Sequence, residues 1–125
     1  MKIIYFWLLI FVFLSACKDK TPSSGSDVEA CGVKDPIRNL SWLKNKIDEA
    51  KDENQENILT VTMVTVREKQ VINYYLSYMS CIGCVSYNCD GTPFDMGSLT
   101  DAERMAYQKN IWGDSKERVV LWPQK

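Results

Sequence analysis

The sequence predicts a small α+β domain. An N-terminal helix should pack on a small antiparallel sheet, a second short helix should precede a last strand, and disulfides should staple the fold. Apolar residues recur at helical spacing over residues 39–51, and β-branched and aromatic residues dominate residues 58–67 and 70–79. Because short polar connections join the strand-like runs, we expect an antiparallel sheet, either open or closed like a barrel.

The first helix is expected over residues 39–51. One apolar stripe is formed by four residues spaced three or four apart: Leu40, Leu43, Ile47 and Ala50. Charged residues occupy the opposite face, so the helix should cover a sheet on one side only. Asn39 belongs to the residue types that cap helix N-termini. The pair Asp35-Pro36 suits a turn before the helix.

Residues 58–67 and 70–79 are expected to form a hairpin, because polar residues around Glu68 and Lys69 connect them. Apolar residues occur at both odd and even positions of the first run, so both faces of the sheet should be at least partly covered. The second run contains Tyr74 and Tyr75, and Tyr78 follows them. These tyrosines either pack in the core with polar tips or form an aromatic binding ledge.

A second hairpin is predicted from residues 85–89 and 92–94. Asp90-Gly91 lies between them and favours a type I′ turn, in which both central residues have positive φ. Pro93 has no N–H to donate, which places the returning strand at a sheet edge.

The last helix is predicted to begin at a capping box formed by Thr100 and Glu103 and to end between residues 110 and 113. Residues 119–122 then read as a short final strand, which Pro123 terminates.

The N-terminus has the pattern of a lipoprotein signal. Lys2 precedes an apolar run over residues 3–14, which as a helix would span only roughly 18 Å, against about 30 Å of bilayer core. Residues 14–17 read Leu-Ser-Ala-Cys and resemble a lipobox, so residues 1–16 are a predicted signal peptide and Cys17 a predicted lipidation site. Diacyl and amide-linked chains on Cys17 would anchor the protein to a membrane.

The predicted organisation is therefore a signal peptide over residues 1–16, a lipidated cysteine and flexible tether over residues 17–30, and one domain over residues 31–125. The tether is rich in Ser, Lys, Asp, Thr, Pro and Gly, with little to bury. We expect an outer-membrane lipoprotein on either the periplasmic or the cell-surface face. The charged residues Lys18, Asp19 and Lys20 loosely resemble surface-export tags.

Composition excludes several function classes. The chain has no histidine, which removes Ser-His-Asp and Cys-His catalysis and the usual zinc-hydrolase ligand sets. Lys and Arg number 15 against 16 Asp and Glu, without a basic cluster, so nucleic acid is not an expected partner. No spacing of carboxylates or serines assembles an acid/base pair or an activated nucleophile. We therefore expect a monomer that is not an enzyme and uses neither a cofactor nor a metal.

Four cysteines follow the tether: Cys31, Cys81, Cys84 and Cys89. An even number in a short exported domain favours two structural disulfides, with three connectivities left open. Cys81 and Cys84 also form a C-x-x-C pair, which is the pattern of a redox centre, and a four-cysteine zinc site is the remaining alternative. A bridge from Cys31 to the later cysteines would close a loop of about fifty residues and contribute roughly 4 kcal/mol.

Two segments carry a resemblance to known proteins. Residues 31–44 read Cys-Gly-Val-Lys-Asp-Pro-Ile-Arg-Asn-Leu-Ser-Trp-Leu-Lys, and residues 87–92 read Tyr-Asn-Cys-Asp-Gly-Thr. Both resemble segments of small bacterial outer-membrane lipoproteins, which open on Cys-Gly, Asn/Asp-Pro-Leu and Leu-Pro-Trp-Leu-Lys and later carry a Tyr-x-Cys-Asp-Gly hairpin. Ile37 and Ser41 depart from that opening, and the usual cysteine soon after the Asp-Gly turn is absent.

Size, lipobox, tether and stapled domain are similar to those of one functional subset, the potempins, which inhibit secreted endopeptidases. That resemblance implies a peptidase as protein partner. A rigid, disulfide-braced loop suits this role, because its ordering cost is met before binding. The candidate loops lie next to cysteines and comprise Gly32, Val33, Lys34 and Asp35, and Ile82 and Gly83. Both also fit plain disulfide scaffolding, and the alternative function is a surface module that binds glycan or an envelope protein.

Overall fold

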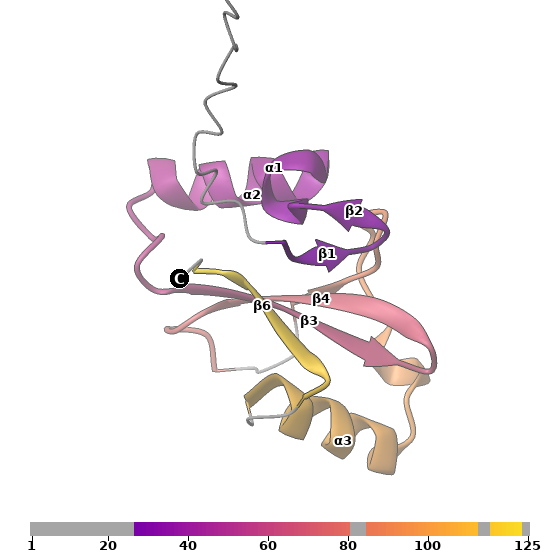
Figure 1. The fold of residues 1–125 in the computed structure, drawn as a ribbon. Coiled ribbons are helices and arrows are strands. Elements are labelled where there is room, and N and C mark those ends of the chain that lie inside the picture. The colour runs from indigo at the N-terminus through magenta and orange to yellow at the C-terminus, as the bar shows by residue number, and fades with distance from the viewer. Residues whose placement is uncertain (1–26, 81–84, 113–115, 124–125) are drawn as a thin grey trace, which may run out of the picture.

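The computed structural model describes residues 27–80, 85–112 and 116–123. Within them, an open four-stranded sheet lies between two helical layers (Figure 1). Its strands are β3 (Leu59–Val66), β4 (Lys69–Leu76), β5 (Ser86–Tyr87) and β6 (Arg118–Trp122), in the order β5-β4-β3-β6. The α+β prediction is confirmed. The barrel-like alternative is wrong, because β5 and β6 are two separate edges of the described sheet.

The helices cover opposite faces of this sheet. Figure 1 shows α1 (Pro36–Asn39) and α2 (Ser41–Asp52) on one side, and α3 (Asp101–Trp112) on the other. A two-stranded sheet made of β1 (Glu29–Ala30) and β2 (Val33–Lys34) lies beside α1 and α2. Ala30 is fully buried, and β1 is paired with β2. The folded part therefore includes Glu29 and Ala30, which the sequence placed in the tether.

Side chains along β3 point alternately to the two faces of the sheet and contribute to a hydrophobic core on each face, as the sequence indicated. Leu59, Val61 and Met63 pack with α2, Ala30 and the facing residues of β4. Val64 and Val66 lie on the opposite face and pack with α3 in a smaller cluster. At the β3–β6 pair the register shifts between Val61 and Thr62, which places an irregularity in the edge strand β6.

The helix predicted over residues 39–51 is confirmed as α2, whose stripe buries Leu43, Ile47 and Ala50. Its expected cap is wrong. Leu40 has an extended backbone (φ −94°, ψ 98°) and separates α1 from α2, so Asn39 ends α1. The amide of Asn39 instead donates to the carbonyl of Lys34, at 2.7 Å.

Both hairpins and the last helix occur where they were predicted. The capping box of α3 is formed: Glu103 N–H donates to the Thr100 hydroxyl at 3.2 Å, and Thr100 N–H donates to the Glu103 carboxylate at 2.8 Å. The second hairpin turn is not type I′. Only Gly91 of the Asp90-Gly91 pair has positive φ (+85°), and Asn88 N–H donates to Thr92 O, as in a three-residue loop.

The predicted membrane attachment lies outside the described residues, since residues 1–16 and Cys17 are not among them. Within the described ranges, no helix combines the length and the apolar character needed to span a bilayer.

Candidate functional site: two hairpin tips joined by a disulfide

The first hairpin places the predicted residues Gly32, Val33 and Lys34 at the surface. Glu29 pairs with Lys34, and Ala30 pairs with Val33. Two residues therefore make the turn, and both have positive φ: Cys31 at 57° and Gly32 at 70°. Gly32 and Lys34 are exposed and Val33 is half-buried. A Cβ atom placed on Gly32 would meet nothing within 4 Å, so this tip faces open space.

Several interactions hold this hairpin to the rest of the domain. Cys31 is disulfide-bonded to Cys89, with 5.5 Å between the Cα atoms. Cys31 N–H also donates to the side-chain carbonyl of Gln70 on β4. At the base of the hairpin, Asp35 N–H donates to Val28 O at 3.0 Å. The tip is therefore fixed by one covalent bond and by hydrogen bonds on both sides.

The second hairpin tip is equally constrained. Gly91 N–H donates to Asn88 O at 3.0 Å and closes the turn. The indole N–H of Trp42, on α2, donates to the carbonyl of Cys89 at 2.9 Å. A Cβ atom placed on Gly91 would lie 2.8 Å from Cγ of Trp42, so only glycine fits this close approach.

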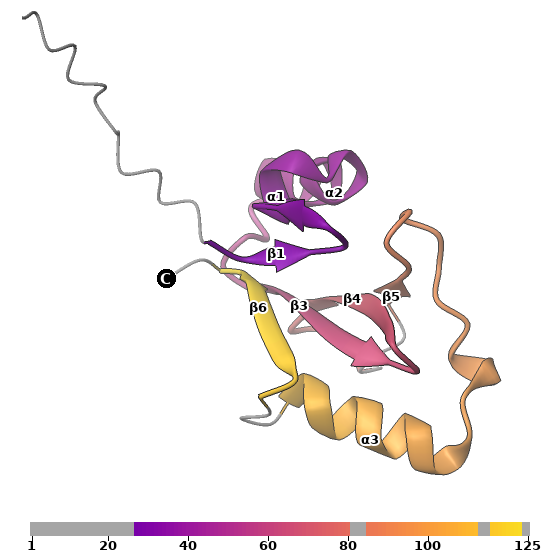
Figure 2. The same ribbon diagram turned by 45° about the vertical axis from the view of Figure 1, so that its right-hand side comes forward.

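The two tips lie side by side. Figures 1 and 2 agree that the β1–β2 turn is next to the loop that follows β5. We call residues 31–34 together with residues 89–92 the stapled tips. In Figure 2 they lie on the side opposite to the start of β1 and the end of β6. The disulfide thus joins the two turns into one braced surface.

The stapled tips carry charge of both signs. Lys34 is exposed on the first tip and Asp90 is exposed on the second. One carboxylate oxygen of Asp90 accepts from the hydroxyl of Thr92 at 2.6 Å and from its N–H at 2.9 Å. These hydrogen bonds hold the pKa of Asp90 below its usual range.

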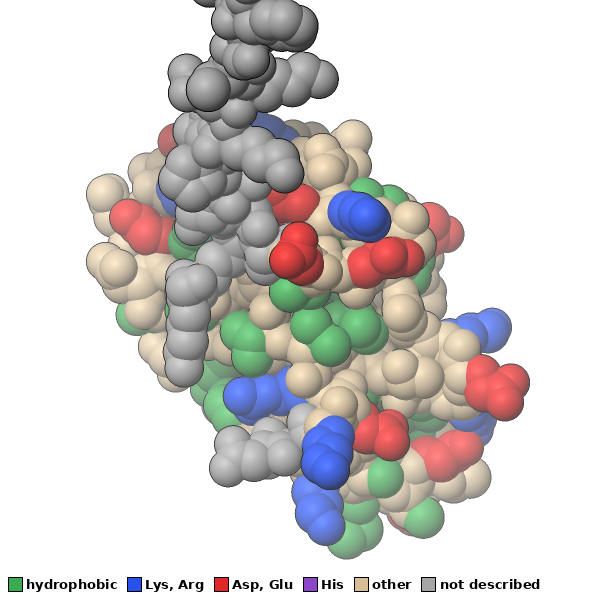
Figure 3. Space-filling model, in the orientation of Figure 1, with side chains coloured by type: hydrophobic (Ala, Val, Ile, Leu, Met, Phe, Trp, Pro, Cys, Tyr) green, Lys and Arg blue, Asp and Glu red, His purple; other side chains and the backbone are tan. Residues whose placement is uncertain are grey.

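On the face seen in Figure 3, acidic and basic side chains surround hydrophobic ones over β6, and neither sign covers the face.

The predicted disulfide residues are only partly covered by the structure. Cys31 and Cys89 are bonded, which confirms the expected link between the region before the first helix and the later cysteines. Cys81 and Cys84 lie outside the described residues, as does the second candidate loop with Ile82 and Gly83. Their pairing and that loop remain predictions.

Sequence reasoning missed the loop over residues 89–92 as part of the site. The signal was present, because Cys89 stands directly before Asp90 and Gly91. It also missed Trp42, whose ring centroid lies 5.4 Å from that of Tyr87 and whose indole fixes the second tip. Asp35, the last residue of the first candidate loop, is half-buried and lies 3.5 Å from the guanidinium of Arg38, so it belongs to the hairpin base.

The three tyrosines do not form one ledge. Tyr74 is 9% exposed on the α2 side, where its hydroxyl donates to Lys46 O at 3.2 Å and burial raises its pKa to about 12. Tyr75 follows it on β4 and therefore points to the opposite face. There its ring packs edge-on against Trp112, with 4.9 Å between centroids. Only Tyr78 is widely exposed, at 64%.

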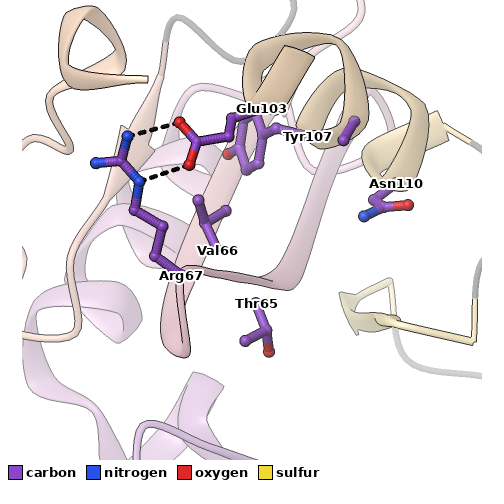
Figure 4. A pocket seen from close by; sticks show the side chains of 7 residues that line it. Thr65, Val66, Arg67, Glu103, Tyr107 and Asn110 are labelled. Atoms are coloured by element: carbon purple, nitrogen blue, oxygen red, sulfur yellow. Dashed lines mark hydrogen bonds and ion pairs between the residues drawn. The ribbon is translucent and has the colours of Figure 1, made fainter. Parts of the chain in front are cut away.

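A shallow pocket of about 140 Å³ lies between the end of β3 and α3 (Figure 4). Arg67 lines it and donates to both carboxylate oxygens of Glu103, at 2.8 and 2.6 Å. The guanidinium, together with the capping N–H of Thr100, lowers the pKa of Glu103 to about 2. Ligand pockets usually measure about 300–1,000 Å³. The pocket is smaller than that range, and the Arg67–Glu103 ion pair beside it joins the β3–β4 turn to α3.

Among the described residues, no cluster of three or more His, Cys, Asp or Glu could hold a metal ion. Comparison of the chain with protein-family models, with curated proteins and with solved structures gave no match. In the part of the chain that the structure describes, the stapled tips combine exposed residues with bracing by a disulfide and by hydrogen bonds.

Proposed function

We propose that this protein is an outer-membrane lipoprotein whose domain binds and inhibits a secreted endopeptidase, a metallo- or serine peptidase, as a non-enzymatic monomer. The tip around Gly32 and Val33 enters the active-site cleft. The observation that carries the proposal is the bracing of this tip by the Cys31–Cys89 disulfide and by Gln70.

Rigidity matters because an inhibitor must occupy a cleft without being ordered on binding. Immobilising a flexible side chain costs about 0.5–1.5 kcal/mol, and ordering a loop costs more. In the first hairpin both turn residues already have fixed positive φ values, and the turn is covalently tied to Cys89. The space around this turn is also open, because a Cβ placed on Gly32 would meet nothing within 4 Å. A turn with open space around it can enter a cleft without a clash from the rest of its own domain.

The position of the tips also supports the proposal. The predicted tether precedes β1, and Figure 2 shows the start of β1 on the side opposite to the stapled tips. An anchor at Cys17 would therefore be attached, through the predicted tether, to the side of the domain away from the tips. A peptidase outside the membrane would reach them without contact with lipid.

The test uses the mature chain from residue 17, with Cys17→Ser so that it stays in solution. It is titrated against a panel of metallo- and serine endopeptidases, including those secreted by the same cell. We expect stoichiometric, nanomolar inhibition of one class. Val33→Asp should weaken it at least about 100-fold, because a charge would be buried in the contact.

Val120→Asp is the matched control. Val120 is 39% exposed on β6 and is not part of the stapled tips, so the same substitution there should leave inhibition unchanged. Circular dichroism and thermal unfolding would establish that both variants fold. Absence of inhibition by the folded parent across both classes contradicts the proposal. So does equal inhibition by the parent and Val33→Asp.

A second candidate is a surface module that binds glycan or another envelope protein. It is favoured by the pair of Trp112, 47% exposed, and Tyr75, which pack edge-on. By register, Val120 lies on the same face of the sheet as Tyr75. Aromatic faces of this kind can stack on sugars or on apolar side chains. Loss of binding to an envelope extract in Trp112→Ala, with inhibition absent in the parent, would favour this function.

A further inference from the structure

The disulfide that braces the first hairpin also fixes a second exposed turn beside it. We propose that residues 89–92 contact the same peptidase as the first tip, and that the carboxylate of Asp90 pairs there with a Lys or Arg side chain on the rim of the cleft. This inference rests on the proposed function and adds to it the second contact and the chemistry of the partner's rim.

Asp90 is held in place but not neutralised. Its Oδ1 atom accepts two hydrogen bonds from Thr92, which fix the side chain on the exposed turn. Among the described residues, the ion pairs engage other acids, such as Asp48 with Lys44 and Glu103 with Arg67, and none includes Asp90. The carboxylate is thus a fixed negative charge with room for a cation.

The two tips cannot move independently. Cys31 and Cys89 belong to different tips and are covalently joined, with 5.5 Å between their Cα atoms. Trp42 holds the second tip through the carbonyl of Cys89 and through its close approach to Gly91. A cleft that receives the first tip therefore meets the second at a fixed offset. The second contact then forms without a further loss of translational or rotational freedom.

The charges on the two tips restrict the orientation in which a partner can bind. Lys34 lies on the first tip and Asp90 on the second, and both are exposed. A partner must present the opposite charges in the matching order, and a reversed order would bring like charges together. Complementary charges of this kind mainly set selectivity and association rate. We therefore expect Asp90 to select among peptidases whose clefts are otherwise similar.

The experiment measures the inhibition constant of the mature Cys17→Ser chain against the peptidase identified above, at about 20 and 200 mM salt. Asp90→Asn keeps the acceptor for Thr92 and removes the charge, and we expect a roughly five- to tenfold weaker constant at low salt. Asp90→Lys reverses the charge and should weaken it by about 100-fold. Both differences should shrink at high salt, because the interaction is screened.

Asp95→Asn is the matched control. Asp95 is also exposed, and its Oδ1 atom also accepts a backbone N–H bond, from Gly97 at 2.9 Å, but it lies outside the stapled tips. It should inhibit like the parent. Equal inhibition by the parent and Asp90→Lys overturns the second contact, and so does an equal loss in Asp90→Asn and Asp95→Asn. In either case the proposed function stands if Val33→Asp still abolishes inhibition. If the parent inhibits nothing, both proposals fail.

Discussion

Removing the Cys31–Cys89 disulfide should destabilise the domain severely. The perturbation is the double substitution Cys31→Ser and Cys89→Ser. The two cysteines are 58 residues apart in sequence, so their bond restricts most of the domain in the unfolded state. For a loop of that length, the chain-entropy relation gives about 4 kcal/mol. Domains have only about 5–15 kcal/mol of stability in total, so the variant should be marginal.

The assay is urea unfolding followed by circular dichroism, with the parent measured both oxidised and in the presence of a thiol reductant. We expect the double variant to unfold well below the oxidised parent. The reduced parent should unfold at the same urea concentration or lower, because the reductant also breaks a predicted bridge between Cys81 and Cys84. The slope of the free energy against urea should also be larger without the bridge, because the unfolded chain then exposes more surface.

A loss below about 1 kcal/mol in the double variant would refute this reasoning. It would mean either that the bridge does not form or that the unfolded chain is already as compact as the bridged one. Peptide mapping of the oxidised parent separates these two explanations, because a fragment joining Cys31 to Cys89 is expected only in the second.

Three further predictions concern the helices and the turns. The lowered pKa of Glu103 means that its ion pair stabilises the fold above its usual pKa of 4.5 and that this contribution is lost as pH falls toward about 2. The difference in unfolding free energy between the parent and Glu103→Gln should therefore be constant above about pH 5.5 and shrink below pH 4.5. Gly91→Ala should cost at least about 2 kcal/mol, because it combines strain at positive φ with a steric clash, whereas Gly32→Ala should cost only about 1 kcal/mol. Thermal unfolding of the two variants checks this, and equal costs would contradict it. Leu43→Ala, at a fully buried position, should cost about 2–5 kcal/mol in urea unfolding, and a loss under 1 kcal/mol would place Leu43 outside the core.

Local chemistry was enough to predict most of the regular elements. The stripe that includes Leu43 and Ile47 has helical spacing, and it is the buried face of α2. Thr100 and Glu103 are three residues apart, and at this spacing each backbone N–H can donate to the side chain of the other residue, which forms the capping box. In both cases the signal lies in residues three or four apart, so it could be recognised without knowledge of the distant residues against which the helix packs.

Features that depend on distant residues were not predictable in the same way. The turn at Asp90-Gly91 was expected to be type I′, yet Gly91 takes its conformation against Trp42, far away in sequence. The pairing of Cys31 with Cys89 also depends on how the sheet brings the two hairpins together. Both features depend on contact between separate elements, which the local sequence does not contain.

The place of the disulfide also decides how the domain would bear mechanical load. A pull applied between the start of β1 and a partner seated on the stapled tips would run along β1 to Cys31 and cross to Cys89. The chain between these two cysteines contains α2, β3 and β4, and it would stay outside the path of the force. A load applied along this line would therefore strain only the short hairpin and its sulfur bridge, and the sheet would keep its shape.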